Sequence, residues 1–387
     1  MNKKKFLAAL LASTLLLGCG GGGNTANNSS QEESKEETKE ETKEETKEET
    51  KEETKEETSS NIAIDELKLQ FVPSRPAEEI ITTTSGLGDL LIAELATRGY
   101  DVGNVTIDVS SSFEAAGEAL SAGSIDLAWL PSGTYILYSD ETDVILTATR
   151  AGLSNDSENP ADWNGVENKT LRSGDQVAYY KGLIYAGPSP KGKELAEKVN
   201  KGEKLTWEDL DSATWCISSN PSSNAGYSFP TLWMMQNYDG KKLTDLSNTI
   251  QDNYAGAFQK LAAEQVDVTV CYADGRTDYE EDWETPTDKT TSKGNGWGRP
   301  ASIWEEVNVI GVTDNIYNDT IAITKAKPEV YNPEFIKAFQ DAMIAISETE
   351  EGKEIIGIYT PEGYLPAKDS DYDSMRSALE IAQGVSQ

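Results

Sequence analysis

Short apolar runs alternate with segments of helical periodicity along most of this chain. The apolar runs predict strands at 67–72, 105–109, 125–130 and 144–149. The periodic segments between them predict helices at 88–98, 113–120 and 132–138, the first of which ends at Gly99. Because strand–helix–strand units usually place their strands in parallel, this part of the chain predicts a parallel sheet with crossover helices.

The same alternation restarts after a polar stretch that runs from Gly152 to Asp175. Strands are predicted at 182–186, 214–218 and 266–272, and helices at 194–199, from Gly226 onward, and at 254–264. Two further strands, 307–312 and 320–324, are predicted to lead back. Asn332 followed by Pro333 predicts the start of another helix, with asparagine as the cap and proline in the first turn.

This order of elements predicts an α/β protein with two lobes and mixed, mostly parallel sheets. Residues 61–175 and 313–387 are assigned to the first lobe, and residues 176–312 to the second. Roughly 325 residues are more than one hydrophobic core usually supports. Open α/β sheets bind ligands beyond the carboxyl ends of their strands, so two facing lobes predict a ligand cleft between them.

The N-terminus predicts secretion. Lys3, Lys4 and Lys5 precede an apolar run that ends shortly before Gly18 and Cys19. The run is shorter than the roughly 20 residues that span a bilayer. Residues 1–18 resemble a bacterial lipoprotein signal, which implies that Cys19 is acylated and becomes the first residue of the mature chain. An ordinary secretory signal followed by a chance cysteine is the alternative.

Residues 19–60 predict a flexible tether. Four glycines (Gly20 to Gly23) follow the cysteine, and a Lys-Glu-Glu-Thr unit then repeats six times from Lys35 to Thr58. The repeat contains no apolar residue and cannot bury a core. A flexible chain of this length reaches roughly 35 Å, so we interpret it as a spacer between a membrane and the folded part.

Composition excludes several classes of function. The formal net charge is −33, which argues against nucleic-acid binding. The chain has no histidine, so histidine-dependent nucleophile pairs and the commonest zinc sites are absent. No motif predicts a metal site or a cofactor. The acidic charge repels anions at a distance, so an anion would have to be captured by short-range hydrogen bonds from uncharged donors.

Two cysteines remain after Cys19, and both lie in strand-like runs. Cys216 follows Trp215, and Cys271 lies in the run from Val268 to Tyr272. Outside the cytoplasm the pair could form a disulfide. Buried free thiols are an equal alternative, because cysteine is common in protein cores.

The most informative polar segment is Asn220-Pro-Ser-Ser-Asn-Ala-Gly-Tyr-Ser-Phe-Pro230, which follows a predicted strand and opens a helix. Hydroxyl groups and free backbone N–H groups at a helix N-terminus suit a tetrahedral oxyanion. Serine and asparagine also cap many helices that bind nothing. A second turn of this kind, Leu130-Pro-Ser-Gly-Thr-Tyr135, follows the third strand.

With these segments in order, the chain resembles the substrate-binding lipoproteins of phosphate, phosphite and phosphonate ABC importers. The resemblance runs from about Leu67 to Tyr364. It rests on Phe71-Val-Pro-Ser74, the Leu130–Tyr135 turn, the tyrosine-containing segment 176–186, the Ser222–Pro230 loop, Val266–Asp274 and Asn318-Asp-Thr320. It implies a type II periplasmic-binding-protein fold, a small-molecule ligand held in the cleft, and a permease in the membrane as partner.

The resemblance also implies which side chains contact the ligand. Ser222, Ser223 and Asn224 match the family's anion-holding loop. The further positions that it implies are Ser132, Tyr135, Tyr179, Tyr180 and Asp274. In phosphonate binders the position of Asp274 can face a ligand ammonium group, whereas a solvated loop aspartate is the alternative.

The loop also departs from the family pattern. Asn224 and Ala225 lack the hydroxyl groups that are usual in the family at these positions. Lys181 stands where a small hydroxyl residue is expected. It would either bring a positive charge to the site or lie on the surface in solvent. These departures leave the identity of the ligand open.

The predicted function is therefore capture of phosphate, phosphite or a small phosphonate by a monomeric, lipid-anchored binding protein outside the cell. A binding protein for a quaternary ammonium is the first alternative, because the chain has eight tryptophans and sixteen tyrosines. A surface enzyme is the second. Its candidate carboxylates are Glu280, Glu281, Asp282 and Glu284, which are predicted to lie close together in a polar loop, whereas a glycosidase needs two carboxyl groups across a substrate groove.

Overall fold

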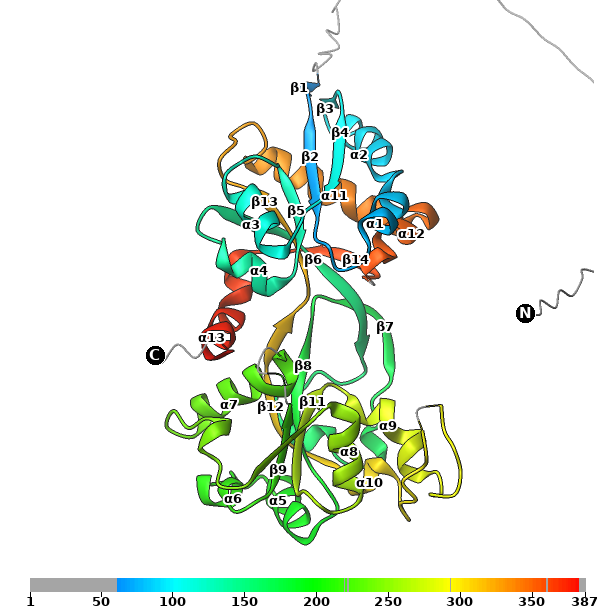
Figure 1. Ribbon diagram of the computed structural model, residues 1–387, viewed down its shortest axis with the longest axis vertical. Coiled ribbons are helices and arrows are strands. Elements are labelled where there is room, and N and C mark those ends of the chain that lie inside the picture. Colours follow the sequence, from blue (N-terminus) through cyan, green and yellow to red (C-terminus); the bar gives the residue numbers. More distant parts are fainter. Residues whose placement is uncertain (1–60, 219, 221–222, 293, 360, 383–387) are drawn as a thin grey trace, which may run out of the picture. The chain divides into compact units, whose positions relative to one another are not determined.

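Two large mixed sheets, with helices packed against them, organise the chain (Figure 1). The computed structural model describes residues 61–218, 220, 223–292, 294–359 and 361–382, and all of them belong to one structural unit. The predicted signal, Cys19 and the repeat tether lie outside the described residues and stay predictions.

The first sheet takes its strands from both ends of the described chain. Its order is β14-β6-β13-β5-β2-β4, and β7 pairs with β6. β2 is parallel to β4 and β5, as the strand–helix alternation predicts, whereas β13 returns antiparallel between β5 and β6. Its strands are β2 (Leu67–Phe71), β4 (Val105–Val109), β5 (Leu127–Leu130), β6 (Thr142–Leu153), β7 (Arg172–Val177), β13 (Thr320–Thr324) and β14 (Gly363–Pro366).

Apolar clusters cover both faces of the first sheet. α1, α2, α11 and α12 contribute to one cluster, and α3, α4 and α13 to the other. A short parallel pair, β1 (Ile62–Ile64) with β3 (Tyr100–Val102), extends the first of these layers. The helices are α1 (Ala77–Thr84), α2 (Leu87–Ala96), α3 (Phe113–Ser121), α4 (Ser132–Leu137), α11 (Pro333–Glu348), α12 (Glu350–Ile356) and α13 (Asp373–Ala382).

Helix α11 illustrates why the sequence folds in this way. Phe335, Phe339, Met343 and Ile346 recur at a spacing of three or four residues and are all buried. Asn332 caps the helix by accepting a hydrogen bond from the Phe335 N–H group at 2.9 Å. The predicted start of this helix is confirmed.

The second sheet has the order β10-β9-β11-β8-β12. β9 is parallel to β10 and β11, and β8 is antiparallel to both of its neighbours. One cluster beside this sheet includes residues of α8, α9 and α10, and another includes residues of α5, α6 and α7. The elements are β8 (Tyr179–Ala186), α5 (Pro190–Asn200), α6 (Trp207–Asp211), β9 (Trp215–Ser218), α7 (Phe229–Asn237), β10 (Thr249–Asp252), α8 (Tyr254–Ala262), β11 (Val268–Tyr272), α9 (Gly275–Glu284), α10 (Ile303–Glu306) and β12 (Asn308–Tyr317).

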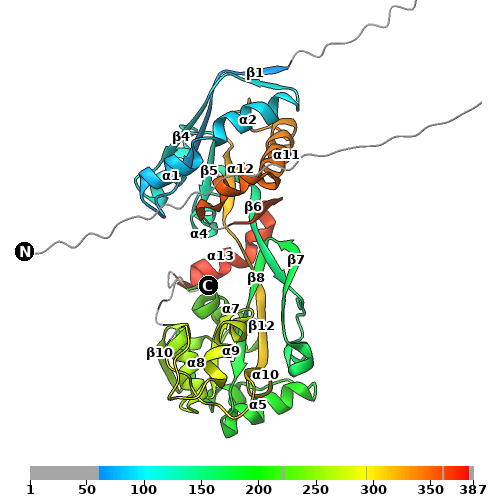
Figure 2. The ribbon, with the colours of Figure 1, turned by 90° about the vertical axis from the view of Figure 1, so that its right-hand side faces the viewer.

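Short connections join the two sheets. Ala178 separates β7 from β8, and only Asn318 and Asp319 separate β12 from β13. Figure 2 shows β8 and β12 lying side by side, and their pairing continues to Tyr179 opposite Tyr317. By sheet membership the two parts would meet at these connections, a few residues after the predicted lobe boundaries at 175/176 and 312/313, which fall inside β7 and β12. The lobe boundaries stay a prediction.

Most predicted strands and helices are present, but three strands are longer than predicted. β6 continues to Leu153, β8 begins at Tyr179, and β12 continues to Tyr317. The added residues are partly polar and gain their strand structure from pairing with β7 and with each other, which an apolar pattern does not reveal. The polar stretch 152–175 is also more ordered than a loop, because it contains η1 (Pro160–Trp163), η2 (Val166–Asn168) and the start of β7.

Cys216 and Cys271 are free and buried. Cys216 lies opposite Thr269 in the pairing of β9 with β11, so the two thiols are not cross-strand partners. Burial raises the pKa of Cys216 to about 11 and raises the pKa of Cys271 further above its usual range. Of the two alternatives from the sequence, the structure supports buried thiols.

Both thiols are expected to be unreactive in the folded protein. In a Cys19→Ser protein at about pH 8, DTNB should modify neither Cys216 nor Cys271 until denaturant is added, because the reactive thiolate is scarce and inaccessible. The measurement is absorbance at equal times with and without guanidinium. Modification of a thiol within minutes under native conditions would contradict the burial described here.

Candidate functional site

Two cavities adjoin where β6 and β7 meet the start of β8. One, the tyrosine cavity, has a volume of about 360 Å³, and the other, the first-sheet cavity, about 650 Å³. Arg150, Ala151 and Arg172 line both cavities. The walls of the tyrosine cavity also include Trp163, Tyr179, Tyr180, Lys181, Tyr254 and Tyr272.

Arginine side chains stand at the junction of the two cavities. Arg150 lies on β6, is exposed, and places its guanidinium 5.0 Å from the centre of the Tyr180 ring. Arg172 begins β7 and donates a long hydrogen bond of 3.4 Å to the Ala151 carbonyl. Guanidinium groups are planar donors whose geometry matches the oxygens of carboxylate and phosphate groups, so these two arginines are candidate anion ligands.

The tyrosines of this cavity keep their protons at neutral pH. Tyr179 donates to the Asp156 carboxylate at 2.7 Å, and this hydrogen bond is the main reason that its pKa rises to about 12. Burial raises the pKa of Tyr180. Both phenols are neutral, but Tyr179 already donates its one hydroxyl hydrogen to Asp156, so Tyr180 is the phenol of this pair that can donate to a ligand. The structure therefore brings Tyr179 and Tyr180 into one cavity, where the resemblance places them.

Lys181 also faces this cavity, and it is not a surface residue. Its side chain is 5% exposed and donates to the Asn315 side chain at 2.7 Å. The Asp156 carboxylate lies 3.6 Å from its ammonium group. The alternative of a solvated surface lysine is wrong, and a third positive charge lies near the two arginines.

The predicted anion-holding loop reaches the tyrosine cavity through Tyr254. The Ser223 hydroxyl lies 2.9 Å from the Tyr254 hydroxyl. The backbone carbonyl of Ser223 accepts hydrogen bonds from the N–H groups of Tyr227 and Ser228. Asn224 opens a single π-helical turn (η3, Asn224–Ser228), a conformation that is frequent at functional sites. Ser222 lies outside the described residues, so its predicted role stays a prediction.

Gly226 allows this loop to pack closely. A Cβ atom at this position would lie 2.7 Å from the Ser218 Cβ and Ser223 Oγ atoms, and 3.0 Å from the Tyr254 hydroxyl. No side chain fits there without displacing the contact between Ser223 and Tyr254.

The first-sheet cavity contains a carboxylate near Arg150. Asp319 is exposed within the cavity, and the surrounding protein atoms desolvate it and raise its pKa, which Arg150 and the Ser132 N–H group partly oppose. Trp129 and Tyr359 form part of the wall. A bound anion would therefore approach a carboxylate as well as the arginines.

Two predicted contact residues of the first lobe do not reach these cavities. Ser132 is 5% exposed, and its backbone N–H group donates a hydrogen bond to the Asp319 carboxylate. Tyr135 is fully buried, donates its hydroxyl to Asp369, and packs edge-on against Tyr372 at 5.4 Å. No local sequence pattern indicates this inward orientation, because a tyrosine in a short helix can face either side.

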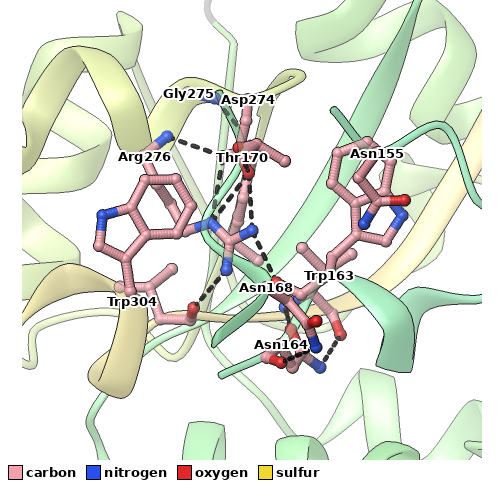
Figure 3. Close-up of polar contacts among 12 residues, drawn as sticks. Asn155, Trp163, Asn164, Asn168, Thr170, Asp274, Gly275, Arg276 and Trp304 are labelled. Carbon is pink, nitrogen blue, oxygen red and sulfur yellow. Dashed lines mark hydrogen bonds and ion pairs between the residues drawn. The ribbon is translucent and has the colours of Figure 1, made fainter. Parts of the chain in front are cut away.

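Asp274 is neither solvated nor available to a ligand in this structure. Its carboxylate is fully buried in an ion pair with Arg276 at 2.6 Å and also accepts hydrogen bonds from Thr170 and Tyr185 (Figure 3). The alternative of a solvated loop aspartate is wrong. Contact with a ligand ammonium would require this network to open.

Sequence reasoning missed Arg150, Arg172 and Tyr254. Arg150 directly follows a predicted strand, and the carboxyl end of a strand is where an α/β site is expected, so a signal for it existed. Arg172 and Tyr254 carried no such signal, since they come to the cavity through tertiary pairing. The cavity is thus not lined by uncharged donors alone.

The described residues give no sign of a metal site or a membrane span. No cluster of three or more cysteine, aspartate or glutamate side chains in this part of the chain has a geometry that could hold a metal ion. Among the helices described, none combines the length and hydrophobicity that crossing a bilayer requires.

Comparisons with known proteins agree with this architecture. The Mh-p37 protein of Mycoplasma hyorhinis is 12% identical, with a TM-score of 0.50 over 83% of this chain and 99% of that chain, which shows the shared fold. The binding component of an ABC phosphonate transporter from Pseudomonas aeruginosa is 12% identical over 83% and 87% of the two chains, with a TM-score of 0.37. A Prochlorococcus marinus protein in complex with methylphosphonate is 10% identical over 83% and 99%, with a TM-score of 0.38.

No curated protein matches the sequence. The family model of the periplasmic substrate-binding protein of phosphonate ABC transporters matches residues 69–372, which is most of the chain. The fold is that of the type II periplasmic binding proteins, as predicted. The chain therefore belongs to the family of periplasmic phosphonate-binding proteins of ABC transporters.

Proposed function

We propose that this substrate-binding protein captures phosphate, phosphite or a small phosphonate and delivers it to a membrane permease. The observation that carries the proposal is the position of Arg150, which lines both cavities and lies over Tyr180. The anion would be bound by this guanidinium, with further donors from Arg172 and from the loop at Ser223 and Asn224. The hinge between the sheets would then close over it.

The geometry favours an anion over a quaternary ammonium ion. Two aromatic faces of the tyrosine cavity already carry cations, since Arg150 lies over Tyr180 and the Lys181 ammonium lies 5.6 Å from the centre of the Tyr179 ring. A cationic ligand would be repelled by these positive charges. The Asp156 carboxylate, which could attract such a ligand, already lies 3.6 Å from the Lys181 ammonium group.

The four carboxylates that suggested an enzyme lie in helix α9 and not in the predicted loop, and three of them have partners within the protein. Glu280 binds the Lys169 ammonium at 2.5 Å, and Asp282 is buried and accepts a hydrogen bond from Thr291. The Ser292 hydroxyl donates to Glu281 at 3.1 Å. These contacts hold the segment to its own neighbours, and they support binding and transport over catalysis.

The N-terminus supports attachment to the outer face of the membrane. We include in the proposal an acylated Cys19, a spacer made of the Lys-Glu-Glu-Thr repeats, and a monomer that meets the permease by diffusion on the membrane surface. The length of the spacer would let the folded part reach roughly 35 Å from its anchor.

Replacing Arg150 tests the proposal directly. Arg150→Met should weaken the best-bound oxyanion about 10- to 100-fold, because a charge-assisted hydrogen bond contributes about 1.5–3 kcal/mol. Phosphate, phosphite, methylphosphonate and choline would be titrated by calorimetry against wild type and variant. Saturable binding of choline alone would reverse the assignment.

Arg75→Met is the matched control for this experiment. Arg75 lines the first-sheet cavity but is already paired with Glu79 at 3.1 Å on the surface. Its replacement should change the affinity less than twofold, since exposed pairs contribute little. Equal losses in the two variants would show a general charge effect and no anion site at Arg150.

A methyl group at Gly226 should disturb the loop. Gly226→Ala is expected to destabilise the protein by about 1–3 kcal/mol and to weaken oxyanion binding, because the new Cβ displaces Ser223 or Tyr254. Gly357→Ala, where no atom lies within 4 Å of the added Cβ, is the control. Thermal melting and calorimetry give the two quantities, and wild-type affinity in a folded Gly226→Ala protein would separate the loop from the site.

Cys19 is predicted to carry the membrane anchor. Cells that express the Cys19→Ser variant should incorporate no labelled palmitate into the protein, because the acylated thiol is gone. Labelling and membrane fractionation, with Cys216→Ser as the matched control, measure the effect. Equal lipid labelling of the Cys19→Ser and wild-type proteins would rule out this attachment.

A further inference from the structure

A completely buried ion pair lies directly behind the wall of the tyrosine cavity. The side chains of Asp274 and Arg276 are both 0% exposed, and the Arg276 Nη2 atom lies 2.6 Å from the Asp274 Oδ2 atom. The Arg276 Nε atom adds contacts of 3.1 Å and 3.2 Å to the two carboxylate oxygens. The free-energy cost of desolvating two buried charges often offsets their Coulomb attraction. A contribution to stability therefore does not by itself explain why this ion pair is present.

The remaining hydrogens of the guanidinium bind distant parts of the chain. Arg276 donates from Nη1 to the Val307 carbonyl at 3.1 Å and from Nη2 to the Trp163 carbonyl at 2.9 Å. Its plane lies 4.5 Å from the centre of the Trp304 ring (Figure 3). One side chain therefore joins the connector between β6 and β7, the start of α9, and the residue before β12.

The carboxylate adds two more attachments. Asp274 accepts hydrogen bonds from the Thr170 hydroxyl at 2.9 Å, which lies on the same connector, and from the Tyr185 hydroxyl of β8 at 3.1 Å. Its Oδ1 atom also accepts from the Arg276 N–H group at 3.0 Å, so it caps helix α9. All three guanidinium nitrogens and both carboxylate oxygens therefore have hydrogen-bond partners inside the protein.

One residue bonded to the pair lines the tyrosine cavity, and so do the two residues that precede Asp274 in the chain. Trp163, Tyr272 and Ala273 line the tyrosine cavity, and Asp274 directly follows Ala273. Trp163 is held at both ends, because its carbonyl accepts from Arg276 and its indole N–H group donates to the Ser157 carbonyl at 3.0 Å. Movement of the ion pair would move this wall relative to Tyr179 and Tyr180.

We propose that Asp274 and Arg276 are positioning residues that set the shape of the tyrosine cavity, and with it the choice among oxyanions, without touching the ligand. The identity of the ligand as an oxyanion rests on the proposed function. The positioning of the cavity wall by the ion pair rests only on the contacts described above. Lysine cannot replace Arg276, since a compact ammonium cannot reach the carboxylate and two carbonyls in different directions.

The test compares Arg276→Lys with Arg299→Lys. Arg299 is a matched arginine of the same sheet layer, with an ion pair to Glu306 at 2.6 Å, a hydrogen bond to the Ala262 carbonyl at 2.9 Å and a nearby Trp283 ring, but it lies outside the tyrosine cavity. Both variants are expected to melt at a lower temperature. Only Arg276→Lys should change the affinity ratio of phosphate to methylphosphonate, by about fivefold or more, which corresponds to about one kcal/mol.

A second variant separates folding from positioning. In the double variant Asp274→Leu with Arg276→Met, apolar side chains of similar size replace the pair and should leave the protein folded. Its melting temperature should fall, because the cap of α9 and the donors to the Val307 and Trp163 carbonyls are lost, while the selectivity of the folded protein changes as in Arg276→Lys. A folded double variant with the wild-type affinities for both anions would overturn the proposal.

A ligand-free measurement keeps the proposal independent of the assigned function. Acrylamide quenching of Trp163, obtained as the difference between each protein and its Trp163→Phe counterpart, should increase in Arg276→Lys and not in Arg299→Lys. If the wild type binds neither anion, the proposed function fails, and this measurement still decides whether the pair holds the wall. Unchanged quenching in Arg276→Lys would refute the positioning role.

An ammonium contact by Asp274 predicts a different pattern. Asp274→Asn would then weaken 2-aminoethylphosphonate and leave methylphosphonate unchanged. The positioning role predicts that both ligands lose affinity together, because both use the same cavity wall. A selective loss of the amino compound would therefore overturn the proposal in favour of direct contact.

Discussion

The pairing of β8 with β12 is the interaction on which both the fold and the candidate site depend. These two strands carry the chain into and out of the second sheet. Asn318 strengthens their common end, because its side-chain amide donates to the Ala148 carbonyl at 3.0 Å and to the Val177 carbonyl at 3.4 Å. The Arg150 guanidinium lies over the Tyr180 ring, near the short connections between the two sheets. Its positive charge is therefore held close to these connections.

This arrangement would allow a strongly acidic protein to hold the anion that we propose as its ligand. The net charge of −33 acts at long range, but charges separated by more than about 8 Å are largely screened at physiological ionic strength. Within that distance an anion at the junction would meet the guanidinium groups of Arg150 and Arg172, and donors such as Tyr180. The acidic surface then opposes the approach of anions, whereas local contacts determine whether one stays bound.

The sequence predicted the fold better than the site. Apolar runs are strong signals, so β2, β4, β5 and β13 lie where they were predicted. Tyr179 and Tyr180 both line the tyrosine cavity, and their contact with a ligand stays a prediction. Arg150 was missed because β6 continues past the apolar run through pairing with polar residues of β7. The inward orientation of Tyr135 and the burial of Asp274 depend on partners far along the chain, Asp369 and Thr170, and no local pattern contains that information.

The burial of Asp274 and Arg276 also bears on how such a family diversifies. A ligand-contacting carboxylate can be changed with little effect on its surroundings, whereas a carboxylate that joins β8, α9 and the connector between β6 and β7 cannot. If this position is fixed by packing, it acts on ligand choice only through the shape of the cavity wall. Arg150, Lys181 and Asp319 are among the charged groups that line the cavities themselves. Two proteins can therefore carry an aspartate at the same position of a motif and use it differently. In one protein it would neutralise a charged ligand, and in another it would shape the cavity.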